Sequence, residues 1–357
     1  MNGQSVGTGK RGLVNRRAWP AAWAVAAALA GVLAVVACGR ESISFDAPAR
    51  PRLGQITVCG ETGLDGRFDA VIRKGKEARQ EVRRPLVGLY DLLKKPDLFR
   101  DRSALFVPLV AGLSREPCAG RDPEDCPGRA EWADGLRQAG VDAVSLAAPI
   151  FEDEDGGARD RTAGILADSG ICAAWADEAR PPCVLALGPR KVAVVAVGAG
   201  AGAEELAARL VARAREAADV VLLSVAFGAG EGQAARLARA RAIDAAAKAE
   251  ILVAHHPGSF GGIESREGRI LLHNPGALLS FEEPGGDAEL SFCHRIHLGP
   301  EGVAWLEAIP VFVDERRSRQ AFLEEARRAV GSLVAASREL GTEVRDEFGR
   351  GILDLGR

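Results

Sequence analysis

Several residue patterns that mark common enzyme classes are missing from this sequence. It has no Cys-x-x-Cys or Cys-x-x-Cys-His motif, which argues against thioredoxin-type redox chemistry and covalent c-type haem. No Gly-x-Ser-x-Gly elbow follows a predicted strand: the one match, at 3–7, lies in the basic N-terminal segment and so lacks the usual setting of a nucleophilic serine. The glycine-rich stretch 198–202 lacks Gly-Lys-Ser/Thr, so it predicts a tight turn rather than a nucleotide-binding loop. Histidine is scarce, with five residues in 357, so few side chains can supply imidazole ligands.

Acidic residues are absent from the first 37 positions, which form a positively charged segment followed by an apolar one. Lys10, Arg11, Arg16 and Arg17 precede the apolar stretch 18–37, which ends in Val-Val-Ala before Cys38. This pattern predicts a lipoprotein signal peptide over 1–37, acylated Cys38 as the first mature residue, and a polar tether over 38–54.

Two other interpretations of this segment stay open. The apolar stretch is long enough to remain as an uncleaved membrane anchor, and its paired arginines are compatible with a twin-arginine signal. Under the lipoprotein and the anchor interpretations alike, the rest of the chain lies in the cell envelope, on its periplasmic or extracellular face.

Charge argues against a nucleic-acid partner. Four of the 46 basic residues and none of the 49 acidic residues precede residue 38, so the remaining chain has a net charge of −7. A surface of this charge does not favour polyanions. We therefore expect no nucleic acid among the partners.

Six cysteines follow Cys38, an even number that favours disulfides in an oxidising compartment. Proximity in sequence suggests Cys118 with Cys126 and Cys172 with Cys183, which leaves Cys59 with Cys293. Other connectivities stay open, because six cysteines can pair in many ways.

Short apolar runs alternate with amphipathic stretches after the tether, which is typical of an α/β domain. We expect strands at 55–59, 104–109, 142–147, 183–187, 192–197, 220–224 and 251–253, with helices between them. Beyond Gly258 the pattern changes to strands without helices, at 269–273, 289–297 and 303–313. These predict a second, largely antiparallel sheet. A final helix is expected over about 318–340, with Gly341 as its C-cap and the outside of the domain as its position.

Two adjacent histidines, His255 and His256, follow the apolar run 251–253 after one alanine. Ligand sites of α/β sheets gather just beyond strand ends, so this pair is a candidate for metal binding. A second candidate is the cluster Cys293, His294 and His297. Alternate residues of a strand point to opposite faces, so these three side chains are not expected to converge.

Three blocks, taken in order, resemble the bacterial capsule-synthesis CapA family, poly-γ-glutamate capsule proteins with a calcineurin-like metallophosphoesterase fold. The first block is 140–147 followed by Asp153, the second runs from 219 through the His-His-Pro loop to 281, and the third comprises 309–311 and 337–342. The resemblance implies an α/β fold in which a two-sheet sandwich is flanked by helices, over 55–345, with a C-terminal tail at 346–357. It also implies divalent metals held at strand ends.

Most ligand positions implied by this resemblance carry other residues here. Glu61 stands where the family has an aspartate, and Asp153 and the histidine pair 255–256 also match it. Residues 105–109, Ala148-Pro149 and Ala226 cannot coordinate a metal through their side chains, and Gly258 replaces a histidine. Glu61, Asp153, His255 and His256 are therefore the only candidate ligands for a family-type divalent metal. The alternative is that the histidines are hydrogen-bonded remnants that shape the loop.

The leading hypothesis is an envelope lipoprotein of the CapA type that is not a catalyst and takes part in assembly or export of a surface polymer, polyglutamate or polysaccharide. Its partners would then be the membrane, through Cys38, and envelope assembly proteins or the polymer. One alternative is a phosphoesterase with a single metal held by Glu61, His255 and His256. Another is a periplasmic protein that binds a small molecule in a cleft lined by Ile150, Phe227 and His256.

Overall fold

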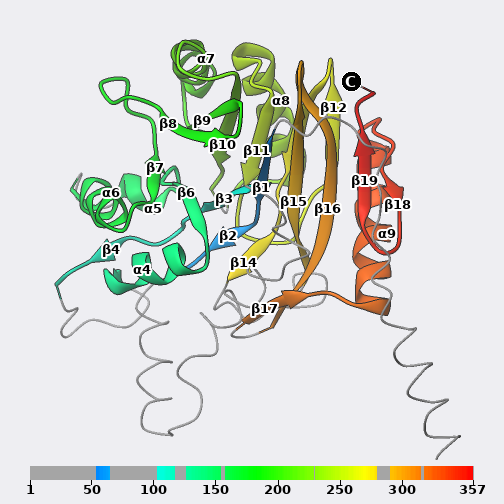
Figure 1. Cartoon of the computed structure of the whole chain (residues 1–357), viewed down its shortest axis with the longest axis horizontal. Helices are drawn as coiled ribbons and strands as arrows, with labels where there is room; N and C mark the ends of the chain where they lie inside the picture. The colour runs from blue at the N-terminus through cyan, green and yellow to red at the C-terminus, as the bar shows by residue number, and fades with distance from the viewer. Residues whose placement is uncertain are drawn as a thin grey trace, which may run out of the picture. The chain divides into compact units, whose positions relative to one another are not determined.

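Two β-sheets organise the part of the chain that the computed structural model describes, residues 54–64, 103–116, 126–153, 157–228, 230–279, 290–314 and 317–356 (Figure 1). The protein is therefore of the mixed α/β class, as predicted. The expected signal peptide, Cys38 and almost all of the expected tether lie outside the described residues.

The nine-stranded sheet has the order β18-β19-β16-β15-β1-β3-β6-β7, with β17 also paired to β16. Its strands are Gly54–Val58 (β1), Ser103–Pro108 (β3), Val141–Ser145 (β6), Cys172–Ala174 (β7), Leu290–Gly299 (β15), Gly302–Asp314 (β16), Arg317–Gln320 (β17), Arg345–Asp346 (β18) and Gly351–Asp354 (β19). The strands β1, β3, β6 and β7 are parallel, and β15 joins them antiparallel to β1.

The six-stranded sheet has the order β12-β13-β11-β10-β9-β8. Its strands are Cys183–Leu187 (β8), Arg190–Gly198 (β9), Val220–Ala226 (β10), Ile251–His255 (β11), Ile263–Arg266 (β12) and Arg269–His273 (β13). Two short pairs stand apart: Glu61–Thr62 (β2) with Ala277–Leu279 (β14), and Leu113–Ser114 (β4) with Gly128–Arg129 (β5).

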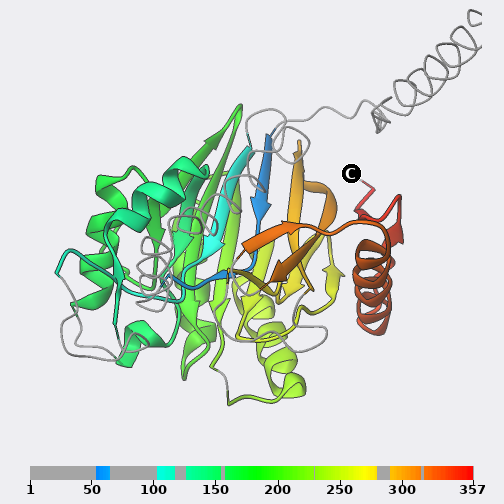
Figure 2. The same cartoon turned by 90° about the horizontal axis from the view of Figure 1, so that it is seen from below.

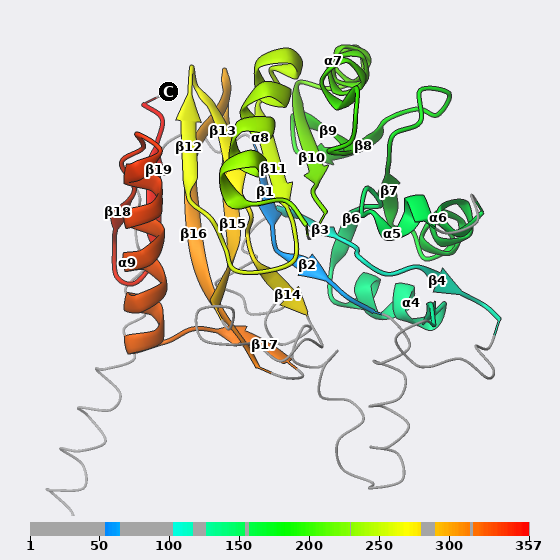
Figure 3. The ribbon, with the colours of Figure 1, turned by 180° about the vertical axis from the view of Figure 1, so that it is seen from behind.

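One hydrophobic core lies between the two sheets, and each sheet has a second apolar face covered by helices. In β10, for example, Leu222 belongs to the shared core and Leu223 to the helix-covered face, because alternate residues of a strand point to opposite sides. Glu131–Gln138 (α4), Ile150–Asp153 (α5) and Ala158–Asp168 (α6) cover the nine-stranded sheet, whereas Ala203–Ala214 (α7) and Gln233–Ala247 (α8) cover the six-stranded one (Figure 3).

The ten strands predicted from apolar runs are all present, with ends shifted by a few residues. Their division between sheets was predicted wrongly. The strand β13 pairs in parallel with β11 and so extends the six-stranded sheet, whereas β15 and β16 join β1. The reason is that pairing between strands far apart in the sequence, here Ile56 opposite Ile296, decides the sheet to which a strand belongs. An apolar run does not indicate which strand it will pair with.

The last helix, Leu323–Glu339 (α9), begins later than predicted because residues 317–320 pair with β16 as β17. Gly341 follows it with a φ of +80°, as expected for a C-terminal glycine. The helix does not simply cover the outside: Ala329, Val330 and Leu333 are fully buried in the core shared by the sheets. It closes the end of that core far from α4 and α6 (Figure 2).

The residues after Gly341 also belong to the domain. The expected C-terminal tail, 346–357, instead supplies β19, whose Leu353 lies opposite Leu306 of β16. The end of α9 and the residues after it also cover the edge strand β12. Ser337 and Thr342 accept hydrogen bonds from the backbone N–H groups of Ile263 and Ser265, at 2.9 and 2.8 Å.

Two of the expected disulfides are present. Cys59–Cys293 joins β1 to β15 across 234 residues, and Cys172–Cys183 joins β7 to β8. Cys126 is disulfide-bonded, but its expected partner Cys118 lies outside the described residues. Disulfides are typical of proteins outside the reducing cytosol. Among the described residues, no helix has both the length and the apolar composition needed to cross a bilayer.

A buried histidine lies on the core side of β15. His294 is 2% exposed and stacks against Phe292, and its Nδ1 atom has no hydrogen-bond partner among the described residues. Burial lowers the pKa of His294 from 6.5 to about 3. The folded protein therefore holds this ring neutral.

This burial predicts loss of stability in mild acid. Between about pH 6.5 and pH 3 the unfolded chain binds a proton at His294 that the folded chain does not, so the free energy of unfolding falls as the pH decreases, by up to about 1.4 kcal/mol per unit. Urea unfolding between pH 7 and pH 5 should show a flatter pH dependence for His294→Phe. His294→Gln, which cannot titrate, should flatten it equally. Slopes that match the wild type in both variants would contradict a neutral buried ring.

Candidate functional site

Two of the four predicted ligands, Glu61 and His255, meet at one end of the core between the sheets. His255 is the last residue of β11, and Glu61 follows β1 by three positions. The Nδ1 atom of His255 lies 3.0 Å from Oε1 of Glu61. The His255 side chain is fully buried, and that of Glu61 is 10% exposed.

A close backbone approach positions Glu61. Its N–H donates to the carbonyl of Gly276 at 2.9 Å, in the turn after β13. A Cβ atom added at Gly60 would lie 2.1 Å from that same carbonyl oxygen, so only glycine fits. The turn after β1 is therefore held directly against the turn at 274–276.

The other ring nitrogen of His255 is also engaged. Its Nε2 atom lies 3.0 Å from the hydroxyl of Ser224, a fully buried residue of β10. The sequence does not predict this contact, because a single serine in an apolar strand gives no sign of its partner. Ser224, His255 and Glu61 form one continuous hydrogen-bonded chain inside the core.

The direction of this chain follows from its donors and acceptors. An ionised Glu61 can only accept, so the Nδ1–H of His255 donates to it, and Nε2 accepts from the Ser224 hydroxyl. The order serine, histidine, carboxylate is that of a hydrolase triad. Ser224 is 0% exposed, however, so its oxygen is closed to a substrate. The geometry supports a satisfied polar network rather than a nucleophile.

Metal binding by His255 would require this network to break. A metal binds the imidazole through an unprotonated ring nitrogen with a free lone pair. Here Nδ1 lies 3.0 Å from Oε1 of Glu61 and Nε2 lies 3.0 Å from the Ser224 hydroxyl, so both ring nitrogens already have a partner. Across the described residues, no group of three or more His, Cys, Asp or Glu side chains is arranged to hold a metal ion.

His256 does not join the chain. Its ring is half-buried and its Nδ1–H donates to the carbonyl of Pro257 at 2.8 Å, while burial lowers its pKa. Asn274 holds the loop from the opposite side. This buried residue has a φ of +72° and donates from Nδ2 to the carbonyls of His256 and Ser259, at 3.2 and 2.9 Å. The run Asn274-Pro275-Gly276 is typical of a turn, but the sequence gives no sign of these contacts.

The remaining predicted positions do not add ligands. Asp153 ends the short helix α5, and its side chain lies outside what the structure describes. Phe227 is 1% exposed and belongs to the helix-covered face of the six-stranded sheet, whereas Ile150 is 39% exposed. The cleft that Ile150, Phe227 and His256 were expected to share is therefore not formed by these side chains.

The alternative cluster on β15 does not converge either, as expected. Cys293 is bonded to Cys59, so its sulfur cannot serve as a thiolate ligand. His294 lies on the core side of the strand, and His297 stacks against Trp305 with 3.6 Å between ring centroids.

A second polar cluster joins α8 to the edge of the six-stranded sheet. Glu264 of β12 accepts hydrogen bonds from Arg241 and lies 3.0 Å from Nε2 of His273. Burial raises the pKa of Glu264, but the hydrogen bonds from His273 and Arg241 outweigh this and lower it to about 2. Glu264 therefore stays ionised at neutral pH, and its contacts with Arg241 and His273 connect β12 to α8 and to β13.

The hydrogen-bonded chain predicts energetic coupling between Ser224 and Glu61, which touch only through His255. Ser224→Ala and Glu61→Ala should each lower the free energy of unfolding by about 1–3 kcal/mol, because each leaves one buried nitrogen of His255 unsatisfied. Denaturant unfolding of the two single variants and the double variant should give a non-additive term above about 0.5 kcal/mol. Strict additivity would show that His255 does not link the two side chains.

Comparison with models of known protein families and with curated proteins finds no match to this chain.

Proposed function

We propose that this protein is an envelope lipoprotein of the capsule-synthesis CapA type that does not catalyse phosphoester hydrolysis and acts in assembly or export of a surface polymer. The observation that carries the proposal is the state of His255, whose two ring nitrogens are both engaged inside the protein. A metallophosphoesterase needs a metal to polarise a phosphoryl oxygen and activate a water. The residue best placed to hold that metal serves a structural network instead.

Other features of the structure support the same proposal. The α/β domain with two sheets that share a core is compatible with the sandwich of this family. The motif at 337–342 has a structural role that needs no metal, because the hydroxyls of Ser337 and Thr342 accept hydrogen bonds from backbone N–H groups of β12. The Asn274 turn and the Gly60 contact likewise hold the His-His-Pro loop and Glu61 in place.

A phosphoesterase with one metal is the second candidate, and one contact favours it. Glu61 and His255 lie within 3.0 Å of each other, so two potential ligands are already together. A metal there would have to take Nδ1 of His255 from its hydrogen bond with Glu61, whereas His256, whose Nδ1–H donates to Pro257, would offer the lone pair of Nε2. Structural zinc sites use four ligands and catalytic zinc sites three plus water.

These two candidates differ in metal content and activity. Under the proposal, the full chain loaded with manganese should retain well below one metal per protein after desalting, and should cleave bis(p-nitrophenyl) phosphate no faster than Glu61→Gln and His256→Ala do. Elemental analysis and a colorimetric assay measure both. One tightly held metal that disappears in His256→Ala, together with activity that disappears with it, would establish the phosphoesterase instead.

The role in a surface polymer can be tested in the bacterium that carries the protein. Deletion should lower the amount of cell-surface polyglutamate or polysaccharide, and Glu61→Gln should restore it, because the amide oxygen can still accept from His255 while the carboxylate ligand is gone. Cys38→Ala, which cannot be acylated, should restore it poorly. Surface polymer that is unchanged by deletion would contradict the role, and failure of Glu61→Gln with normal protein levels would point back to metal chemistry.

A further inference from the structure

A cavity of about 530 Å³ lies between the edges of the two sheets, away from Glu61 and His255. Its walls come from α6, β7, the start of β8, β9, α7 and the connection 175–182. A volume of 300–1,000 Å³ is typical of sites for small molecules. The strand ends that carry the His-His-Pro loop do not contribute to it, so this is a separate site.

The chemistry of the cavity favours an uncharged ligand. Its apolar surface comes from Ala163, Ile171, Val194, Leu210 and the indole of Trp175. Its two carboxylates both pair with Arg180, Asp160 at 3.1 Å and Asp177 at 3.2 Å, and its second arginine, Arg213, donates to the backbone carbonyl of Glu178. Arg180 covers one side of the indole, so an apolar ring would pack on the remaining surface of Trp175 and leave these pairs intact.

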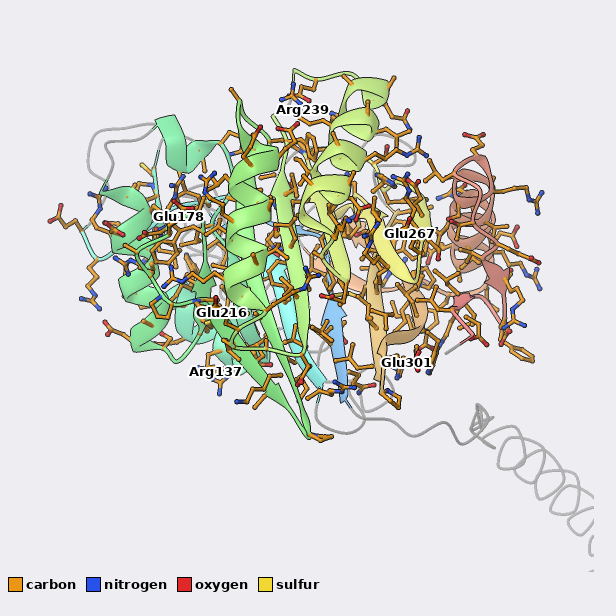
Figure 4. All side chains as sticks on the ribbon, turned by 90° about the horizontal axis from the view of Figure 1, so that it is seen from above. Arg137, Glu178, Glu216, Arg239, Glu267 and Glu301 are labelled. Carbon is orange, nitrogen blue, oxygen red and sulfur yellow. A yellow bond between two sulfur atoms is a disulfide. The ribbon has the colours of Figure 1, made fainter. Side chains whose placement is uncertain are left out.

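The connection that carries Trp175 is held in place from several sides. The Cys172–Cys183 disulfide closes it at its base, and the guanidinium of Arg180 lies 4.6 Å from the centre of the Trp175 ring. Glu178, at the side of α7 in Figure 4, pairs with Arg209 at 2.6 Å, and its carbonyl accepts from Arg213. A wall fixed before binding reduces the entropy lost when a ligand is held.

We propose that this cavity binds an uncharged small molecule with an apolar ring that packs against Trp175. The site is independent of the function proposed above, because none of its residues takes part in the Ser224–His255–Glu61 chain. A variant that loses ligand binding in the cavity should therefore keep the role in the surface polymer, and a variant that loses that role should keep ligand binding.

Two helical glycines provide a matched test. Gly164 of α6 lines the cavity, whereas Gly331 lies in α9, outside its lining, and a Cβ atom at either position would meet no atom within 4 Å. The probe is N-phenyl-1-naphthylamine, an uncharged aromatic amine whose fluorescence rises in apolar surroundings. Titrated into the full chain, it should bind saturably to the wild type and to Gly331→Trp, with Kd values within about twofold of each other. Gly164→Trp, which places an indole in the cavity, should abolish the saturable signal.

A second variant keeps the test valid even if Gly164→Trp does not fold. Trp175→Ala should weaken binding of the probe about tenfold, because it removes the ring surface, while circular dichroism matches the wild type. The proposal is overturned if the wild type shows no saturable signal, if Gly164→Trp and Trp175→Ala bind as the wild type does, or if Gly331→Trp loses binding to the same extent as Gly164→Trp.

Discussion

The antiparallel pairing of β1 with β15 is the constraint on which the rest of the structure depends. It joins the first described strand to one that lies more than two hundred residues later, and Cys59–Cys293 makes the junction covalent. Because β1 also pairs in parallel with β3, it connects the early parallel strands to the late antiparallel ones in a single sheet. The same junction brings the turn at Gly60 against the turn at Gly276, and so brings Glu61 to His255.

Burial explains why His255 has the partners it has. A polar group that is removed from water without a hydrogen bond lowers stability, and an imidazole has two nitrogens to satisfy. Ser224 satisfies one and Glu61 the other. His294 shows the other solution, in which one nitrogen stays unpaired and the pKa falls so that the ring remains neutral. The two histidines are equally hidden, yet only one is part of a network.

Sequence was sufficient for local structure and for part of the site. Apolar runs located the strands, Gly341 marked the end of α9, and cysteine spacing suggested Cys172–Cys183, because these signals are carried by neighbouring residues. The sheet to which each strand belongs could not be predicted from the sequence. Both β13 and β15 are apolar runs, and they differ only in the distant strand with which each one pairs. Glu61 and His255 were named together only through a resemblance. Ser224 was missed because its role is defined by residue 255 across the sheet, and no local pattern encodes that contact.

The hydroxyl groups that cover β12 have a consequence for how copies of this protein can associate. An open sheet edge offers unpaired N–H groups to any strand of another molecule, which is a common route to aggregation. Here Ser337 and Thr342 occupy two of those donors, and α9 lies so close to Gly262 that a Cβ atom there would be 2.8 Å from the backbone of Ala336. A strand of another copy that paired with this edge would therefore have to displace these hydroxyl contacts.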